Sequence, residues 1–243
     1  MKTAVLTCAI YPTEDEARKA LWIFIRSAEK AGVPAEDLHL YGIGRDFHRT
    51  DWRTKKLIYQ LDYLKTLPSY YTHVLYSDGG DALFARSLKA IETAYQSLGY
   101  PEMICSAYHW IANWNWNHGE ETPYHRHFKR NIARPFLHCG GYLAEREHVI
   151  ATFQRMLELP NQTNDDCWNW MDAYAEGWFR PVIDSDCLIF YVADSVDILG
   201  KTAYIKNDWV SFPGIIHLSG GYADHGTWKD YKLEPLAREL GVI

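Results

Sequence analysis

The sequence predicts an α/β fold in one domain, with a mostly parallel central sheet flanked by helices. Over the first hundred or so residues, short β-rich apolar runs alternate with segments that carry apolar residues at helical spacing. The 243-residue chain is 47% hydrophobic and 23% charged, which is ordinary for a globular domain with a sizeable core. We expect a Rossmann-like sheet, with a ligand crevice at the carboxyl ends of its strands, and a smaller β part toward the C-terminus.

The expected elements of the first half follow one another along the chain. A strand at "AVLTCAI" precedes a helix that Thr13 and Glu16 begin as a capping box and Gly32 ends. A strand at "DLHLYGI", a helix from about Arg53 and a strand at "HVLY" come next. Ser87 caps a further helix, and "EMICSA" is the strand after it.

The second half is less regular. The segment "FLHCGGYLAE" is a strand interrupted by two glycines, which indicates that a ligand or another backbone comes close there. A helix follows, and Asn164, Asp165 and Asp166 stand where the next helix should begin, as favourable caps or as site residues. "PVIDSDCLIFY" predicts one more strand, "DILGKTAYI" a small hairpin, and "PGIIHLSGG" a short strand that carries His217.

Composition narrows the class of protein. Five cysteines are scattered without CxxC spacing, which argues against a zinc knuckle and a disulfide framework. The formal net charge of −6 gives no general attraction to nucleic acid or to an anionic membrane. The N-terminal apolar run of about eight residues is too short for a membrane span, and no signal cleavage site is evident. We therefore expect a cytoplasmic protein, in the host cytoplasm if the source is a virus.

The segment "HVLYSDGGDALF" places two aspartates directly after an apolar strand. In a continuing strand Asp78 and Asp81 would point to opposite faces, but Gly79 and Gly80 permit positive-φ geometry that turns both carboxylates toward one point. Two close carboxylates repel unless a cation lies between them, and hard oxygen ligands suit Mn²⁺ or Mg²⁺. The same residues are also ordinary in a solvated turn, so the motif alone leaves both interpretations open.

Residues 108–135 are too long and too polar for a simple connection, and such loops are usually functional. Tryptophans alternate there with asparagines, which suits stacking on sugar rings or bases, and the basic stretch "HRHFKR" suits phosphates. The alternative is that these tryptophans cover the core while the charges are solvated. The predicted acceptor-binding residues of this segment are Trp110, Trp114, Trp116, Arg126, Lys129 and Arg130.

Six segments in order resemble the glycosyltransferase domain of the procollagen lysyl hydroxylase type, a GT-A family that uses a UDP-sugar and Mn²⁺. They are "RTKKLIYQLDYLK", "VLYSDGGDALF", "FLHCGGYLAE", "NDDCW", "IDSDCLIFY" and "IHLSGG". No single motif is specific; their order carries the likeness, which runs from about residue 3 to 225. It implies one GT-A domain over residues 1–243, made of a nucleotide-binding half (1–107), the aromatic and basic acceptor loop (108–135) and a donor-sugar and acceptor half (136–243).

The resemblance also implies roles for individual residues. It makes Asp78, Asp81 and His217 the metal ligands, and it places Asp165 and Asp166 beside the reacting carbon as catalytic carboxylates. Such a carboxylate would deprotonate the acceptor hydroxyl or stabilise oxocarbenium character. The donor-binding residues that it implies are Thr7, Lys55, Lys56, Asp78, Gly80, Gly140, Gly141 and Gly220.

Departures from the family's motifs fall at donor and acceptor positions. Gly80 stands where the family has the aromatic residue that stacks on uracil, and Tyr11 or Trp52 are candidates to replace that stacking. His138 replaces an asparagine of the "LNSGG" motif. The identity of the sugar and the stereochemical course therefore stay open.

These features predict a metal-dependent hexosyltransferase that uses a nucleoside-diphosphate sugar, with UDP-hexose as the expected donor. The aromatic and basic segment favours a hydroxymethylated pyrimidine in phage-type modified DNA as the acceptor. A glycan or a hydroxylysine-bearing protein is the alternative acceptor, in which case the tryptophans stack on sugar. A non-catalytic sugar-binding protein and a metal-dependent phosphohydrolase are the hypotheses from other classes.

Overall fold

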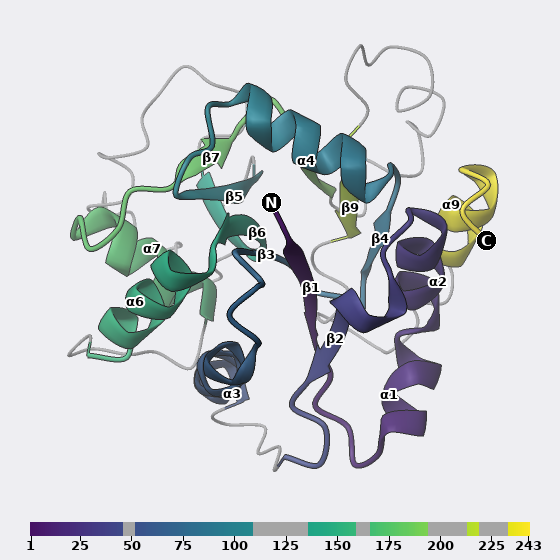
Figure 1. Ribbon diagram of the computed structural model, residues 1–243, viewed down its shortest axis with the longest axis horizontal. Coiled ribbons are helices and arrows are strands. Elements are labelled where there is room, and N and C mark those ends of the chain that lie inside the picture. Colours follow the sequence, from purple (N-terminus) through teal and green to yellow (C-terminus); the bar gives the residue numbers. More distant parts are fainter. Residues whose placement is uncertain (46–51, 109–135, 159–165, 194–212, 219–232) are drawn as a thin grey trace, which may run out of the picture.

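The computed structural model describes residues 1–45, 52–108, 136–158, 166–193, 213–218 and 233–243. Within them a six-stranded sheet lies between two groups of helices (Figure 1). In spatial order its strands are β2 (Leu38–Tyr41), β1 (Thr3–Cys8), β3 (His73–Ser77), β6 (Phe136–Glu145), β5 (Met103–Tyr108) and β7 (Val182–Asp184). Of these six, β6 alone runs against the others, since it pairs antiparallel with β3 and β5. The predicted mostly parallel α/β sheet is confirmed.

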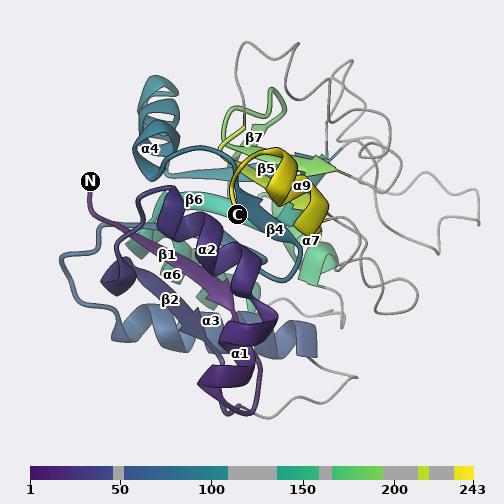
Figure 2. The same ribbon diagram turned by 90° about the vertical axis from the view of Figure 1, so that its right-hand side faces the viewer.

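Helices cover both faces of this sheet, so there is a hydrophobic core on each face. Successive strand residues point to opposite faces and so contribute alternately to the two cores. Leu6, Val74 and Tyr76 belong to the core that α3, α6 and α7 cover, whereas Val5 and Leu75 belong to the core under α2 and α4. The helices are α1 (Glu14–Ala20), α2 (Trp22–Lys30), α3 (Trp52–Thr66), α4 (Leu88–Ser97), α6 (Arg146–Met156), α7 (Asp166–Ala175) and α9 (Glu234–Glu239), with a 3₁₀ turn at Ala35–Asp37. Figure 2 shows α9 beside α2.

Local signals set the helix ends as expected. Thr13 Oγ1 accepts a hydrogen bond from the Glu16 amide at 3.2 Å, and Ser87 Oγ accepts one from the Ala90 amide at 3.2 Å. Gly32, after α2, has a φ of 79°. The predicted first helix is divided at Leu21, which is not helical, into α1 and α2. The hairpin predicted at "DILGKTAYI" lies outside the described residues.

A second, three-stranded sheet has the order β4 (Ala82–Phe84), β9 (Ile215–Leu218), β8 (Phe190–Ala193). The single strand predicted over "PVIDSDCLIFY" was wrong, because the chain bends after β7 and enters this second sheet as β8. The carboxylate of Asp184 accepts hydrogen bonds from the amides of Leu188, Ile189 and Phe190, at 2.7–2.8 Å, and so closes the bend. Three satisfied amides replace the sheet pairing that a continuous strand would have made.

No helix in the described part of the chain is long and apolar enough to cross a membrane. The cytoplasmic location stays a prediction.

Candidate active site

The turn between β3 and β4 carries the two predicted metal aspartates. The Gly79 amide donates to Thr7 Oγ1 at 2.7 Å, and the Asp78 amide donates to the Gly140 carbonyl at 3.0 Å. Neither Gly79 nor Gly80 has a positive φ, so the expected positive-φ geometry was wrong. A glycine is needed at position 79 for space, because a Cβ there would lie 2.6 Å from Thr7 Oγ1. In this structure Thr7 on β1 therefore holds the turn in place through its contact with the backbone of Gly79.

A buried ion cluster of Lys56, Asp78 and Asp166 joins three elements. The Lys56 ammonium from α3 lies 2.7 Å from Oδ1 of Asp78, just after β3, and 3.0 Å from Oδ2 of Asp166, the first residue of α7. Burial by itself lowers the pKa of Lys56, but the charges of Asp166 and Asp78 outweigh it and raise that pKa well above its usual value. Lys56 is therefore a fixed cation at the carboxyl end of β3.

Of the two predicted lysines, Lys56 is the one that points into the protein and contacts the aspartates. The side chain of Lys56 is buried, whereas Lys55 is half-buried. The Lys56 ammonium also lies 5.4 Å from the centre of the Tyr76 ring, and the Tyr76 hydroxyl donates to Asp78. Tyr76 was not among the predicted site residues. Its position two residues before Asp78 was the available signal, because such residues share a face of a strand.

Two of the three predicted metal ligands, Asp81 and His217, come together where β4 meets β9. Nε2 of His217 lies 3.0 Å from Oδ1 of Asp81, and both side chains are buried. The antiparallel register of the two strands produces this contact, since Ala82 pairs with His217. Burial lowers the pKa of His217, but the charge and hydrogen bond of Asp81 outweigh it, so the net shift of the pKa is upward. Nδ1 of His217 is buried and has no hydrogen-bond partner among the described residues.

The paired glycines of β6 make room for side chains. A Cβ on Gly140 would lie 2.2 Å from Cε1 of His217 and 2.6 Å from Cε1 of His138, and one on Gly141 would lie 2.8 Å from the Phe190 ring. The two imidazoles meet edge to face with ring centres 5.0 Å apart. The expected close approach at these glycines is present, and in this structure it is made by side chains. Whether the glycines also line a donor sugar stays a prediction.

His138 is a neutral side chain next to these groups. Its Nδ1 accepts a hydrogen bond from the Gly140 amide at 3.0 Å, which assigns the ring proton to Nε2. Burial, and then the charge of His217, lower the pKa of His138 well below its usual value. His138 thus places a second, uncharged imidazole against the predicted metal ligand.

The donor set of Asp81 and His217 fits a divalent cation. Two ligands at right angles in an octahedral shell, each about 2.1 Å from the ion, lie about 3.0 Å apart, which matches the separation of Nε2 and Oδ1. Within the described residues, no three His, Cys, Asp or Glu side chains are grouped closely enough to hold a metal. The third predicted ligand, Asp78, is held by Lys56 instead. Metal binding stays a prediction.

The remaining predicted site residues are Gly80 and eight residues outside the described part of the chain. Gly80 lies half-buried in the turn between Asp78 and Asp81. The following predicted residues lie outside the described part of the chain: Trp110, Trp114, Trp116, Arg126, Lys129, Arg130, Asp165 and Gly220. Their catalytic, donor-binding and acceptor-binding roles stay predictions.

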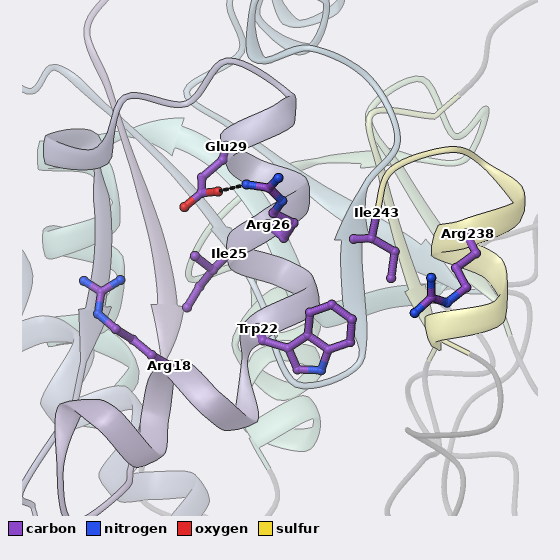
Figure 3. Close-up of a pocket in the computed structure, with 7 residues that line it drawn as sticks. All are labelled: Arg18, Trp22, Ile25, Arg26, Glu29, Arg238 and Ile243. Carbon is purple, nitrogen blue, oxygen red and sulfur yellow. Dashed lines mark hydrogen bonds and ion pairs between the residues drawn. The ribbon is translucent and has the colours of Figure 1, made fainter.

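A separate surface hollow of about 540 Å³ lies on the outer side of α2, between that helix and α9 (Figure 3). We call it the arginine hollow; it is lined by Arg18, Trp22, Ile25, Arg26, Glu29, Arg238 and Ile243. Each arginine is paired with a glutamate on its own helix, so these side chains contribute little net charge. The arginine hollow shares no residue with the predicted site and does not have the chemistry of a diphosphate site.

Comparisons with known proteins place the fold. No protein-family model and no curated protein matches the sequence. A glycosyltransferase involved in the glycosylation of the major capsid of PBCV-1 matches the structure with a TM-score of 0.53 and 13% identity, over 98% of this chain and 100% of that one. Mouse xyloside xylosyltransferase 1 gives a TM-score of 0.49 and 10% identity, over 93% and 100% of the two chains.

A third match is a 4-diphosphocytidyl-2C-methyl-D-erythritol synthase from Anaerococcus prevotii, with a TM-score of 0.42 and 12% identity over 84% of this chain and 98% of that one. At these identities a likeness concerns the fold alone, and the first match, over nearly the whole of both chains, is the one that carries weight. With the six-stranded sheet and its single reversed strand, it shows that this chain has a GT-A-type fold. The narrower resemblance to the lysyl hydroxylase glycosyltransferase domains stays a prediction.

Proposed function

We propose that the protein is a metal-dependent glycosyltransferase that moves a sugar from a nucleoside-diphosphate sugar to a hydroxyl acceptor. The observation that carries the proposal is the buried ion cluster of Lys56, Asp78 and Asp166 at the carboxyl end of β3. Asp81 lies in the same turn as Asp78, and it contacts His217 on β9. In open α/β sheets, ligands bind outside the carboxyl ends of the strands. The GT-A-type fold supports the assignment to a sugar transferase.

The charges in this place suit a diphosphate leaving group. A divalent cation held by Asp81 and His217 would stabilise the charge that grows on the departing nucleoside diphosphate. Lys56 adds a second positive charge, and its ammonium can donate hydrogen bonds to phosphate oxygens. Asp166 is the described carboxylate nearest to that lysine on the α7 side. We assign it the acceptor proton, which it takes as the acceptor oxygen bonds to the anomeric carbon and the bond to phosphate breaks.

We propose UDP-hexose as the donor and a hydroxymethylated pyrimidine of modified DNA as the acceptor. The donor proposal rests on the sequence resemblance, and the acceptor proposal on the aromatic and basic segment 108–135. A glycan or a protein hydroxyl is the second candidate acceptor. The net charge of −6 favours it, and so does the PBCV-1 fold neighbour, which is involved in glycosylation of a capsid protein.

A thermal-shift panel of nucleoside diphosphates and their sugars, each with Mn²⁺ and with EDTA, tests the donor. Saturation at a hundred times the dissociation constant adds roughly 2.7 kcal/mol to the free energy of unfolding. We expect one nucleotide sugar to raise the Tm of the wild type only with Mn²⁺, and to have no effect on Asp81→Ala. Asp186→Ala, which changes an exposed aspartate, is the matched control and should respond like the wild type.

A flat response across the whole panel would contradict the transferase and favour a sugar-binding protein. Release of free sugar or phosphate without any acceptor would instead favour the phosphohydrolase.

The acceptor is tested with the donor that the panel identifies. An oligonucleotide carrying hydroxymethylpyrimidine should gain the mass of one sugar, and the triple variant Arg126→Ala, Lys129→Ala and Arg130→Ala should bind it less tightly at low salt. Transfer to a glycan or a hydroxylysine peptide, with the oligonucleotide unchanged, would favour the second candidate.

A further inference from the structure

We propose that Lys56 competes with the divalent cation for Asp78, so that metal and nucleoside diphosphate are taken up together. This inference rests on the proposed function, and it concerns how the ligands of that site are assembled. It assigns to Lys56 a role in the order of binding, in addition to any contact it makes with the donor.

The carboxylate of Asp78 already has two partners in this structure. Its Oδ1 lies 2.7 Å from the Lys56 ammonium and also accepts the hydrogen bond of the Tyr76 hydroxyl. This oxygen is poorly available to a metal, and a metal on either oxygen of Asp78 would repel the ammonium that lies against the same carboxylate.

Of the described residues, Asp81 and His217 supply two neighbouring ligands of a metal shell. Their 3.0 Å contact suits neighbouring ligands of one ion, and Asp78 lies in the same turn as Asp81. The charge of Asp78 already acts on His217, so the carboxylate is within electrostatic reach of the pair. Each further charged oxygen strengthens the binding of a hard cation. A site with Asp78 released from Lys56 therefore binds metal more tightly than the site as it stands.

Release of Asp78 has a cost for Lys56. Its side chain is only 7% exposed, and a buried charge that loses a partner is strongly disfavoured. Asp166 alone would then remain as its carboxylate partner in the buried ion cluster. A diphosphate would supply the missing negative charge, since phosphate oxygens accept hydrogen bonds from ammonium groups. Metal binding thus favours diphosphate binding, and by linkage the reverse holds by the same factor.

The test measures Mn²⁺ binding by electron paramagnetic resonance of the free ion, with and without UDP, for wild type and Lys56→Met. We expect UDP to tighten Mn²⁺ binding to the wild type by about 5- to 150-fold, the usual range of such coupling. In Lys56→Met, Mn²⁺ alone should bind about 5-fold or more tighter than to the wild type, and the effect of UDP should shrink correspondingly. Asp81→Ala with UDP serves as the blank for Mn²⁺ that UDP binds in solution.

Lys65→Met is the matched control, because it removes an exposed lysine from the last turn of the same helix and should behave like the wild type. The double variant Lys56→Met with Asp166→Asn guards against misfolding, since it removes one buried carboxylate together with the ammonium. It should show the same loss of coupling between Mn²⁺ and UDP.

The outcomes separate the two proposals. Equal Mn²⁺ affinity of wild type and Lys56→Met without UDP, alongside UDP-dependent Mn²⁺ binding to the wild type, overturns the competition and leaves the proposed function intact. No Mn²⁺ binding above the blank by wild type or Lys65→Met, with or without UDP, overturns both.

Discussion

The ion pairs of the buried ion cluster and of the arginine hollow have almost the same length, but they differ in how far they are removed from water. In the cluster, the Lys56 ammonium lies 2.7 and 3.0 Å from its two carboxylates. In the hollow, the Arg18 and Arg26 pairs measure 2.8 and 3.0 Å. The Lys56 side chain is 7% exposed, whereas those of Arg18 and Arg26 are 55% and 68% exposed. The distance alone therefore does not decide how strongly the charges of a pair interact. Their burial away from water does.

The two regions also differ in what holds them together. Each arginine of the hollow finds its glutamate three or four residues away on its own helix, so the pair survives without the rest of the fold. The buried ion cluster exists only when α3, β3 and α7 are packed, because its members come from all three elements. Such a cluster fixes a charge at a defined place, but it does not by itself stabilise the fold more than apolar packing would.

The largest expected effect is that of Lys56→Met measured without metal. Removal of the ammonium leaves two carboxylates close together with no cation, which we expect to cost about 3–5 kcal/mol of the free energy of unfolding. Urea denaturation in EDTA measures this loss. Arg18→Met in the arginine hollow is the comparison, and equal losses in the two variants would remove the distinction between the regions.

Gly140→Ala should have the next largest effect, because it adds a methyl group where His138 and His217 already meet. The new Cβ would lie 2.2 Å from the His217 ring, and overpacking of this kind costs about 1–3 kcal/mol. We expect a lower Tm and a weaker Mn²⁺ response, since the His217 ring must move away from Asp81. A variant of wild-type stability would show that the two rings shift without cost.

Protonation of His138 should account for part of the change in the free energy of unfolding with pH. Because burial and the charge of His217 lower the pKa of His138, the unfolded chain takes up a proton below about pH 6.5 that the folded protein does not. The contribution therefore weakens the fold as pH falls, by up to about 1.4 kcal/mol per pH unit. Lys56 and His217 face this ring with positive charge and Asp166 with negative charge.

His138→Asn, which restores the residue of the resembled family, should lose less stability between about pH 7 and pH 5 than the wild type does. Chemical denaturation in EDTA across that range measures the difference. Parallel curves for the two proteins would mean that His138 takes up its proton in the folded state as it does in the unfolded chain.

The smallest effects should come from the arginine hollow. Arg18→Met and Arg238→Met each remove one exposed pair, and we expect both to stay within about 0.5 kcal/mol of the wild type. High salt should also change their stability, relative to the wild type, very little. A loss above about 1 kcal/mol in urea denaturation would show that this surface supports the fold more than its exposure indicates.

Much of the fold followed from local patterns in the sequence. The strands β1, β2, β3 and β5 were expected from apolar runs, and the capping residues Thr13 and Ser87 were placed correctly. The turn with Asp78 and Asp81 and the strand with His217 were also identified. The split of the strand over 181–191 was not, because the bend depends on three backbone amides that reach the Asp184 carboxylate only in the folded chain.

The sequence by itself determined most of the elements and which of them carry charged or metal-ligating side chains, because periodicity, capping and side-chain type are local properties. The tertiary structure alone decided that Lys56 rather than Lys55 reaches Asp78 and Asp166, and that Asp81 meets His217 through the register of β4 and β9. These contacts join residues far apart in the chain. They arise when apolar faces are buried together, and no local pattern records which charged side chains are buried with them.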